Sequence, residues 1–416
     1  MRIPPSTLLS SLIALASVAG AVMYSQKQAK LYANNPKQDQ KIAALQQQIN
    51  ILQSENETLT NLQVNGSEIT LPLTLYKFAE ENLGLTFPQH VKARRVDNET
   101  LTEAVRYRYT QQFQIEGMEM RQYAFESLGI LPVNQQFTQQ LAIAETAGAV
   151  AIYDASANEI LLSAEFDKEN LLHTTSIIKH LAVALLELNF PLSDTQKSNL
   201  TDDSYHARQG FIRGRASSIA QRYRNITAFK GGHAKQFSPN TEAQETFNSL
   251  PILIKGLTTF PAIYGKTYIE EVILDNDSVF PEIYQQMPQS SATIFAKTMP
   301  RTEALFERSP LTEKQHLNTE LGQLFAKLYL KQLGNDGLGE AGAKLHTKLT
   351  SDQLTINEEE RRTYTISWKT EWETLADAKA FEQFASELSS IPARKPAVTI
   401  SENQVIIQFI DIHTGH

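Results

Sequence analysis

The sequence predicts an α+β fold with a largely helical core that contains a β-hairpin. A C-terminal layer of strands and helices follows the core, and an N-terminal helical stalk precedes it. Two observations support this prediction. Apolar residues recur at helical spacing through most of residues 76–223, interrupted by one pair of short strand-like runs around a turn. The last part of the chain instead contains runs that alternate between apolar and polar residues, as half-buried strands do.

Composition limits the classes of function. The chain has 416 residues, 41% of them hydrophobic and 20% charged, which is enough for a core and excludes a wholly disordered protein. It carries 46 acidic and 38 basic residues, a net charge of -8, so no nucleic-acid partner is expected. It has no cysteine, which excludes disulfide scaffolds, thiol catalysis and thiolate zinc sites.

Residues 1–25 are expected to form a signal peptide or membrane anchor. The apolar run Leu8–Val22 is shorter than the roughly 20 residues of a spanning helix, and Ala19–Ala21 offers small residues for cleavage. We therefore expect an exported protein, periplasmic or otherwise extracytoplasmic, that is either secreted or held at the membrane by an uncleaved segment. Lysines after the run favour the opposite orientation. An apolar helix docked on a soluble domain is the remaining alternative.

Residues 26–66 are expected to form a helical or coiled-coil stalk. Apolar residues at a and d spacing, with an asparagine at one a position, favour a homodimer. These residues are Ile42, Leu45, Ile49, Leu52, Asn56 and Leu59. The pattern covers fewer than three heptads, so a single helix that acts as a spacer is an equal alternative.

The helical core is assigned to residues 70–340. Its expected elements are helices over 76–89, 100–128 and 139–147, a hairpin of strands 150–154 and 159–163, and helices over 174–190 and 204–223. The helix over 174–190 is apolar nearly all round, so we expect it at the domain centre.

The C-terminal α+β segment, residues 341–416, is expected to pack on this core. Before it, Leu317–Leu333 reads as an amphipathic helix. The segment itself has a strand over Thr363–Trp372, a helix capped by Thr374 and Asp377, and a hairpin of residues 397–400 and 404–412.

Several short motifs share one order along residues 120–390. Tyr153-Asp154 ends a strand, the apolar helix ends in Asn189-Phe190, and a later helix carries Arg213-Gly214-Arg215-Ala216. The following pieces are Phe260–Gly265, Met287–Ser291, Ser351–Gln353 at an expected turn, and Trp368–Trp372 with Asp377, Ala378 and Phe381. Together they resemble bacterial zinc-metallopeptidase-like proteins of the gluzincin type, whose central helix carries H-E-x-x-H and whose later helix carries E-G-D-A.

The resemblance implies a zinc site, but this chain lacks its ligands. Counting back from Phe190, the first histidine of the motif falls on Lys179, the glutamate on His180 and the second histidine on Val183. The third ligand falls on Arg213. Protonated lysine and arginine repel a dication, and valine has no lone pair. No catalytic residue, metal or cofactor is therefore expected at these four positions.

The replaced site predicts a pseudoenzyme of the cell envelope that binds or scaffolds an unknown protein or peptide partner. In one interpretation, Lys179 and Arg213 supply fixed positive charge in the former metal cavity, with Glu187 as a candidate partner. In the alternative, His180 is a core histidine bonded to a neighbour, and Lys179 extends from the helix to solvent. Two alternatives are a hydrolase with an unrecognised or rebuilt site and a purely structural envelope protein. No two of the nine histidines have i, i+4 spacing. The arginines over 208–224 form either a solvated helix face or an anion site.

Overall fold

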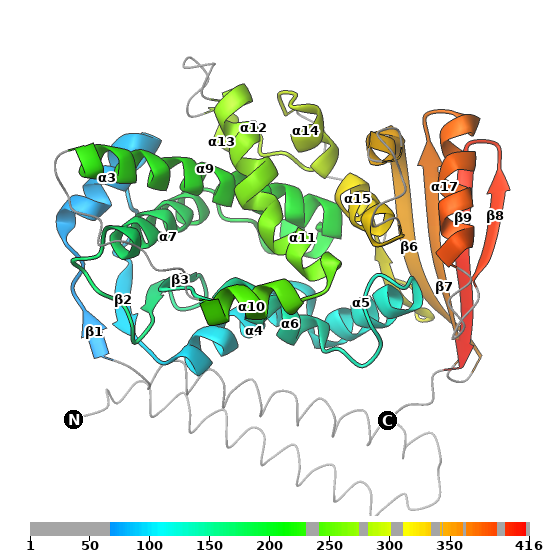
Figure 1. The fold of residues 1–416 in the computed structure, drawn as a ribbon, viewed down its shortest axis with the longest axis horizontal. Helices are drawn as coiled ribbons and strands as arrows, with labels where there is room; N and C mark the ends of the chain where they lie inside the picture. The colour runs from blue at the N-terminus through cyan, green and yellow to red at the C-terminus, as the bar shows by residue number, and fades with distance from the viewer. Residues whose placement is uncertain are drawn as a thin grey trace, which may run out of the picture. The chain divides into compact units, whose positions relative to one another are not determined.

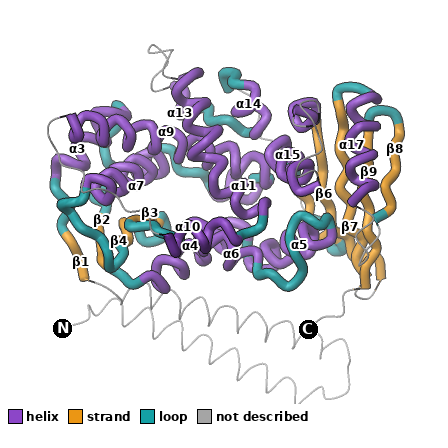
Figure 2. Tube along the Cα trace, viewed as in Figure 1, coloured by secondary structure: helices purple, strands orange, loops and turns teal. Residues whose placement is uncertain are grey.

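The computed structural model describes residues 67–229, 241–273, 282–300, 311–333, 342, 344–360, 363–388 and 396–412. The chain divides into two units, Met1–Asn65 and Gly66–His416. The predicted signal segment, the stalk and its dimer residues lie outside the described part. The second unit has an α+β fold, as the sequence predicted, with two small sheets on opposite sides of a helical body (Figures 1 and 2).

The first helices are α3 (Leu73–Leu83), α4 (Asn98–Phe113), α5 (Ile115–Ser127) and α6 (Phe137–Thr146). The helix expected over 76–89 is shorter, because Gly84 ends α3 in the left-handed conformation. The prediction of a single helix over residues 100–128 is wrong, because two helices, α4 and α5, lie there. Gln114 has φ 61°, which breaks the helical hydrogen bonding and separates α4 from α5.

The first sheet has the order β1-β2-β4-β3. Its strands are β1 (Ser67–Ile69), β2 (Lys92–Arg95), β3 (Ala151–Asp154) and β4 (Glu159–Leu162). The predicted hairpin is confirmed as the antiparallel pair β3–β4. β2 was not predicted, since its sequence Lys-Ala-Arg-Arg has no strand-like apolar pattern. It pairs in parallel with β4, and Arg94 in it bonds Glu159 at 3.2 Å.

Two long helices form the centre of the helical body. α7 (Leu171–Asn189) is the predicted apolar helix and packs along α9 (Asp202–Phe229), which runs beyond the predicted end at residue 223. A Cβ on Gly214 of α9 would overlap the backbone of Gly265, and a Cβ on Gly265 would overlap the backbone of Gly210, also in α9. Gly214 and Gly265 therefore allow α9 to approach the turn Pro261–Gly265 closely, next to Arg213.

Shorter elements surround this pair. They are α8 (Asp194–Asn199), α10 (Thr241–Ser249), α11 (Ile252–Phe260), α12 (Lys266–Tyr268), α13 (Glu282–Gln285), α14 (Ser291–Ala296) and the π-helical turns Pro261–Gly265 and Ile269–Ile273. α7 is the one described helix that is long and apolar enough to cross a membrane by length and composition. Here it packs on α3, α9 and β3, as a core helix does.

The second sheet is antiparallel throughout, in the order β5-β6-β7-β9-β8. It consists of β5 (Gln315–Thr319), β6 (Leu349–Glu360), β7 (Thr363–Trp372), β8 (Ala397–Ser401) and β9 (Gln404–Ile412). A 3-10 turn over Leu345–Lys348 leads directly into β6. Helices α15 (Gly322–Leu333) and α17 (Leu375–Leu388) pack on it. The predicted strand β7, hairpin β8–β9 and cap of α17 are confirmed, with the Thr374 hydroxyl accepting the Asp377 N–H at 3.2 Å.

Two predictions about this region are wrong. Leu317–Leu333 is not one helix, because its first residues pair with β6 as strand β5 and the helix begins only at Gly322. Ser351–Gln353 is not a turn, since it lies inside β6 and pairs with β7. β5 also precedes the boundary drawn at residue 340, so the C-terminal layer includes residues from 315 onward.

Candidate functional site

A cavity of about 290 Å³ opens between the helical body and strand β3. One face of α7 supplies Ser176, Lys179, His180, Val183 and Glu187, and the other walls come from α4, α6, β3, α9, α10 and α11. The four positions that the resemblance assigned to the zinc site, Lys179, His180, Val183 and Arg213, therefore all line one cavity. Helical spacing explains the three on α7, because residues three and four apart share a face.

Glu145 of α6 is the centre of the charge network in this cavity. Its carboxylate accepts hydrogen bonds from Arg108 at 2.6 Å, from Arg213 at 2.9 Å and from the Tyr109 hydroxyl at 2.5 Å. Burial raises the pKa of Glu145, but Arg108 and Arg213 outweigh this effect and hold it well below its usual value. Glu145 is therefore ionised, and it joins α4, α6 and α9.

Lys179 carries a charge that this network does not balance. Among the described residues, no hydrogen-bond or ion-pair partner reaches its amine, and Glu187, the partner expected from the sequence, is not paired with it. Burial lowers the pKa of Lys179, Arg213 lowers it further, and Glu145 partly offsets both. The interpretation that Lys179 and Arg213 share the cavity is consistent with this geometry, but only Arg213 is paired, and its partner is Glu145.

His180 is held as a hydrogen-bond acceptor. Its Nδ1 atom accepts the backbone N–H of Tyr153 at 3.2 Å, so the predicted bond to a neighbour is confirmed. Burial, and then the positive charges of Lys179 and Arg213, lower the pKa of His180 well below its usual value. The ring is therefore neutral, with its remaining proton on Nε2.

These residues do not fit the zinc ion that the resemblance implies. The one carboxylate at the centre of the network already binds two guanidinium groups and a hydroxyl. Lys179 and Arg213 repel a dication, and Val183 offers no lone pair. Across the described residues, no group of three potential metal ligands lies close enough together to hold a metal ion.

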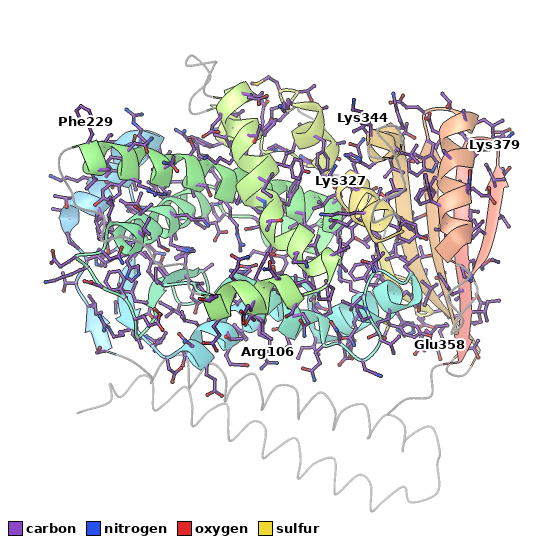
Figure 3. All side chains as sticks on the ribbon, in the orientation of Figure 1. Arg106, Phe229, Lys327, Lys344, Glu358 and Lys379 are labelled. Carbon is purple, nitrogen blue, oxygen red and sulfur yellow. The ribbon has the colours of Figure 1, made fainter. Side chains whose placement is uncertain are left out.

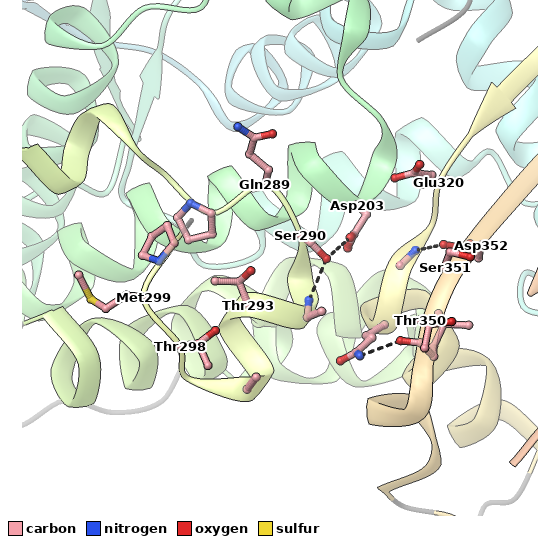
Figure 4. Close-up of a pocket in the computed structure, with 17 residues that line it drawn as sticks. Asp203, Gln289, Ser290, Thr293, Thr298, Met299, Glu320, Thr350, Ser351 and Asp352 are labelled. Atoms are coloured by element: carbon pink, nitrogen blue, oxygen red, sulfur yellow. Dashed lines mark hydrogen bonds between the residues drawn. The ribbon is translucent and has the colours of Figure 1, made fainter. Parts of the chain in front are cut away.

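A second cavity, of about 400 Å³, lies where α9, α14, α15 and β6 meet (Figure 4). Asp203 accepts hydrogen bonds there from the Ser290 hydroxyl at 2.7 Å, from the Ser291 N–H at 3.0 Å and from the Ser291 hydroxyl. Burial raises the pKa of Asp203 to about 7, although the serine hydrogen bonds act in the opposite direction.

Asp352 lies beside the same cavity. It accepts the Gly322 N–H at 2.8 Å (Figure 4). It also accepts the Leu321 N–H at 3.0 Å and the Trp368 indole N–H at 2.8 Å. Both aspartates thus satisfy donors at the start of α14 or α15, and this cavity lies at a structural junction of the helical body with the sheet.

The basic residues of α9 do not form one solvated face. Arg208 donates to the Phe190 carbonyl at 2.6 Å, Arg213 binds Glu145, and Arg215 is buried and donates to the Asn82 carbonyl at 2.8 Å. Arg222 and Arg224 are exposed. The solvated-face interpretation thus holds only for the end of the helix.

Sequence reasoning missed Glu145, Arg108 and Tyr109. A signal existed for Glu145, since it is the only charged residue of α6 (Phe137–Thr146) and follows the apolar run Leu141–Ala144. Its partners lie 37 and 68 residues away, so no local spacing connects them.

No family model, curated protein or solved structure matches this chain.

Proposed function

We propose that this chain is a catalytically inactive, metallopeptidase-like protein (a pseudoenzyme) of the cell envelope that works by binding a partner. One observation carries the proposal. The positions that would hold zinc and its activating glutamate line one cavity, yet they present a lysine, a neutral histidine, a valine and an arginine tied to Glu145. Such a set lacks the metal ligands and the carboxylate with which a gluzincin site activates water.

The open cavity favours binding over a purely structural role. A structural protein is expected to fill a disused cleft with side chains, because voids cost packing energy. Here about 290 Å³ stays open and is lined by charged groups, which a small ligand or a partner's side chain can enter.

Zinc content tests the proposal. The full chain is expressed in zinc-supplemented medium, dialysed against a weak chelator and analysed for metal. We expect fewer than about 0.1 zinc per chain, because the described residues contain no ligand set for the ion. A matched variant, K179H/H180E/V183H/R213E, restores the motif and serves as the positive control. Near one zinc per wild-type chain, with zinc-dependent hydrolysis of a peptide library, would contradict the proposal.

Envelope location is the second part of the proposal, and the apolar segment Leu8–Val22 supports it. Fractionation of cells that produce the chain, with and without residues 1–25, tests it. We expect the intact chain in the envelope fraction and the truncated chain in the cytoplasmic fraction. An intact chain found in the cytoplasmic fraction would contradict this part alone.

A hydrolase at the second cavity is the other candidate, favoured by the bond between the Ser290 hydroxyl and Asp203. A carboxyl group with a pKa near 7 beside a serine hydroxyl has the elements of a base and a nucleophile. Ser290 also caps α14 by accepting the Ala292 N–H at 3.1 Å, which is a structural role. A fluorophosphonate probe decides between these roles, because it labels an activated serine and leaves a capping serine unmodified.

A further inference from the structure

We propose that the cavity between α7 and α9 binds the carboxylate group of a small organic ligand, with the Lys179 amine and the Ser176 hydroxyl as its recognition groups. The inference rests on the proposed binding function and specifies the chemistry of the ligand. It uses three properties of the cavity: its charge balance, its unpartnered polar groups and its apolar lining.

The charge balance favours an anion. Three cationic side chains, Arg108, Lys179 and Arg213, line the cavity, against two carboxylates, Glu145 and Glu187. Glu145 is shared by the two arginines. Glu187 lies eight residues beyond Lys179, about 12 Å along the helix axis, and is too far to neutralise it directly. The Lys179 end of the cavity is therefore positive, and an entering anion relieves the repulsion between Lys179 and Arg213.

The polar groups at this end have free bonding capacity. Ser176 precedes Lys179 by three residues, so both side chains project from the same face of α7 into the cavity. Among the described residues, neither the Ser176 hydroxyl nor the Lys179 amine has a hydrogen-bond partner. The neighbouring hydroxyls of Thr258 and Thr259 already donate to helix carbonyls, at 2.9 and 2.7 Å. An ammonium and a hydroxyl one turn apart suit the two oxygens of one carboxylate.

The remaining lining favours an organic acid over inorganic phosphate. Small apolar residues form much of the wall, and they leave room for a short carbon chain behind the charged group. They are Ala144, Ala147, Ala149, Ala151, Ile152 and Val183. Burial of an apolar chain against them adds to the affinity, and phosphate has no such chain.

Two matched pairs of probes test the inference on the full chain by ligand-observed NMR titration. N-acetyl-Ala-Ala is compared with its C-terminal amide, and butanoate with butanamide. We expect the acid of at least one pair to bind about tenfold more tightly than its amide, because only the acid neutralises Lys179. A preference confined to the first pair indicates a peptide C-terminus as the source of the carboxylate. A preference that includes butanoate indicates a free organic acid.

Variants assign the binding to this cavity. Lys179→Met is expected to weaken the preferred acid about tenfold and to leave its amide unaffected. Ser176→Ala is expected to weaken it by a smaller factor. Lys77→Met, the same change at an exposed position of α3, serves as the control and is expected to bind as the wild type does. Circular dichroism verifies that each variant is folded.

The inference is overturned if neither acid binds, if each acid binds no better than its amide, if phosphate binds as tightly as the acids, or if Lys179→Met binds as the wild type does. These results are separable from failure of the proposed function. A zinc-free chain without acid preference contradicts only the carboxylate ligand, whereas a chain with bound zinc and peptidase activity contradicts the pseudoenzyme itself.

Discussion

Replacing Glu145 with glutamine tests whether the charge network holds the helical body together. The glutamine keeps the shape of the side chain but removes the negative charge between Arg108 and Arg213. Glu145 is 12% exposed, and the two arginine side chains are 23% and 19% exposed, so water screens them only in part. Breaking a fully buried pair costs about 3–5 kcal/mol, and partial exposure places Glu145→Gln near the lower end, at about 3 kcal/mol.

Urea unfolding followed by circular dichroism measures this loss. Helical signal is preferable to fluorescence, because both tryptophans, Trp368 and Trp372, lie in β7 of the second sheet. The matched control is Glu103→Gln. Glu103 pairs with Arg106 on the outer side of α4 (Figure 3), where both side chains are about one-third exposed. We expect the control to change stability by less than about 0.5 kcal/mol.

The sign of the pH dependence gives a second readout for the same variant. The two arginines hold the pKa of Glu145 below its usual value, so the pair contributes stability above about pH 4 and loses it as the pH falls further. Glu145→Gln should therefore differ most from the wild type at neutral pH and converge with it in acid. A loss at pH 7 within about 1 kcal/mol of the Glu103→Gln control would refute the reasoning.

Three further predictions concern other parts of the fold. Gly322 (φ 72°) lies against the Asp203 carboxyl, whereas Gly84 (φ 65°) has open space around it. In urea unfolding, Gly84→Ala should therefore lower the free energy of unfolding by about 1–2 kcal/mol, and Gly322→Ala should lower it by at least about 2 kcal/mol more. Equal losses in the two variants would exclude the close contact at Gly322. Because the folded chain keeps the Asp203 proton up to about pH 7, whereas the unfolded chain loses it near pH 4, the contribution of Asp203 to stability is greatest below pH 4 and falls as the pH rises to 7. Asp203→Asn should reduce this fall by up to about 4 kcal/mol, and an unchanged pH profile would contradict a protonated Asp203. Lys179→Met should leave stability unchanged or raise it in the same unfolding assay, because it removes an unpaired cation from a half-buried wall, and a loss above about 1 kcal/mol would show that Lys179 has a partner.

The sequence predicted which residues line the cavity better than it predicted how those residues pair. Helical spacing places Lys179 and Val183 on one face of α7, and the structure brings Arg213 of α9 to the same cavity. The carboxylate at its centre was not predictable, because Glu145 meets its arginines only through the packing of α4, α6 and α9. Glu187 was a reasonable candidate by spacing, but residues eight apart on a helix do not touch.

Errors in the fold came from places where tertiary pairing overrides local pattern. Leu317–Thr319 shares an apolar periodicity with the helix after it, yet these residues pair with β6. Asp352 of β6 binds the N–H groups of Leu321 and Gly322, where that helix begins. β2 was missed since it has no apolar pattern, and the bond from Arg94 to Glu159 of β4 forms only once the two strands pair. The break at Gln114 has no glycine or proline to signal it.

The charge network joins three of the helices that surround the cavity. A metal ion at the junction of several helices binds ligands from each and so joins them. Glu145 does the same with opposite sign: one buried carboxylate binds guanidinium groups from α4 and α9 while itself belonging to α6. This arrangement satisfies two of the three cations that line the cavity. Lys179 is the third, and because no described residue forms a hydrogen bond or an ion pair with it, its position in the open cavity is more consistent with a ligand than with the fold.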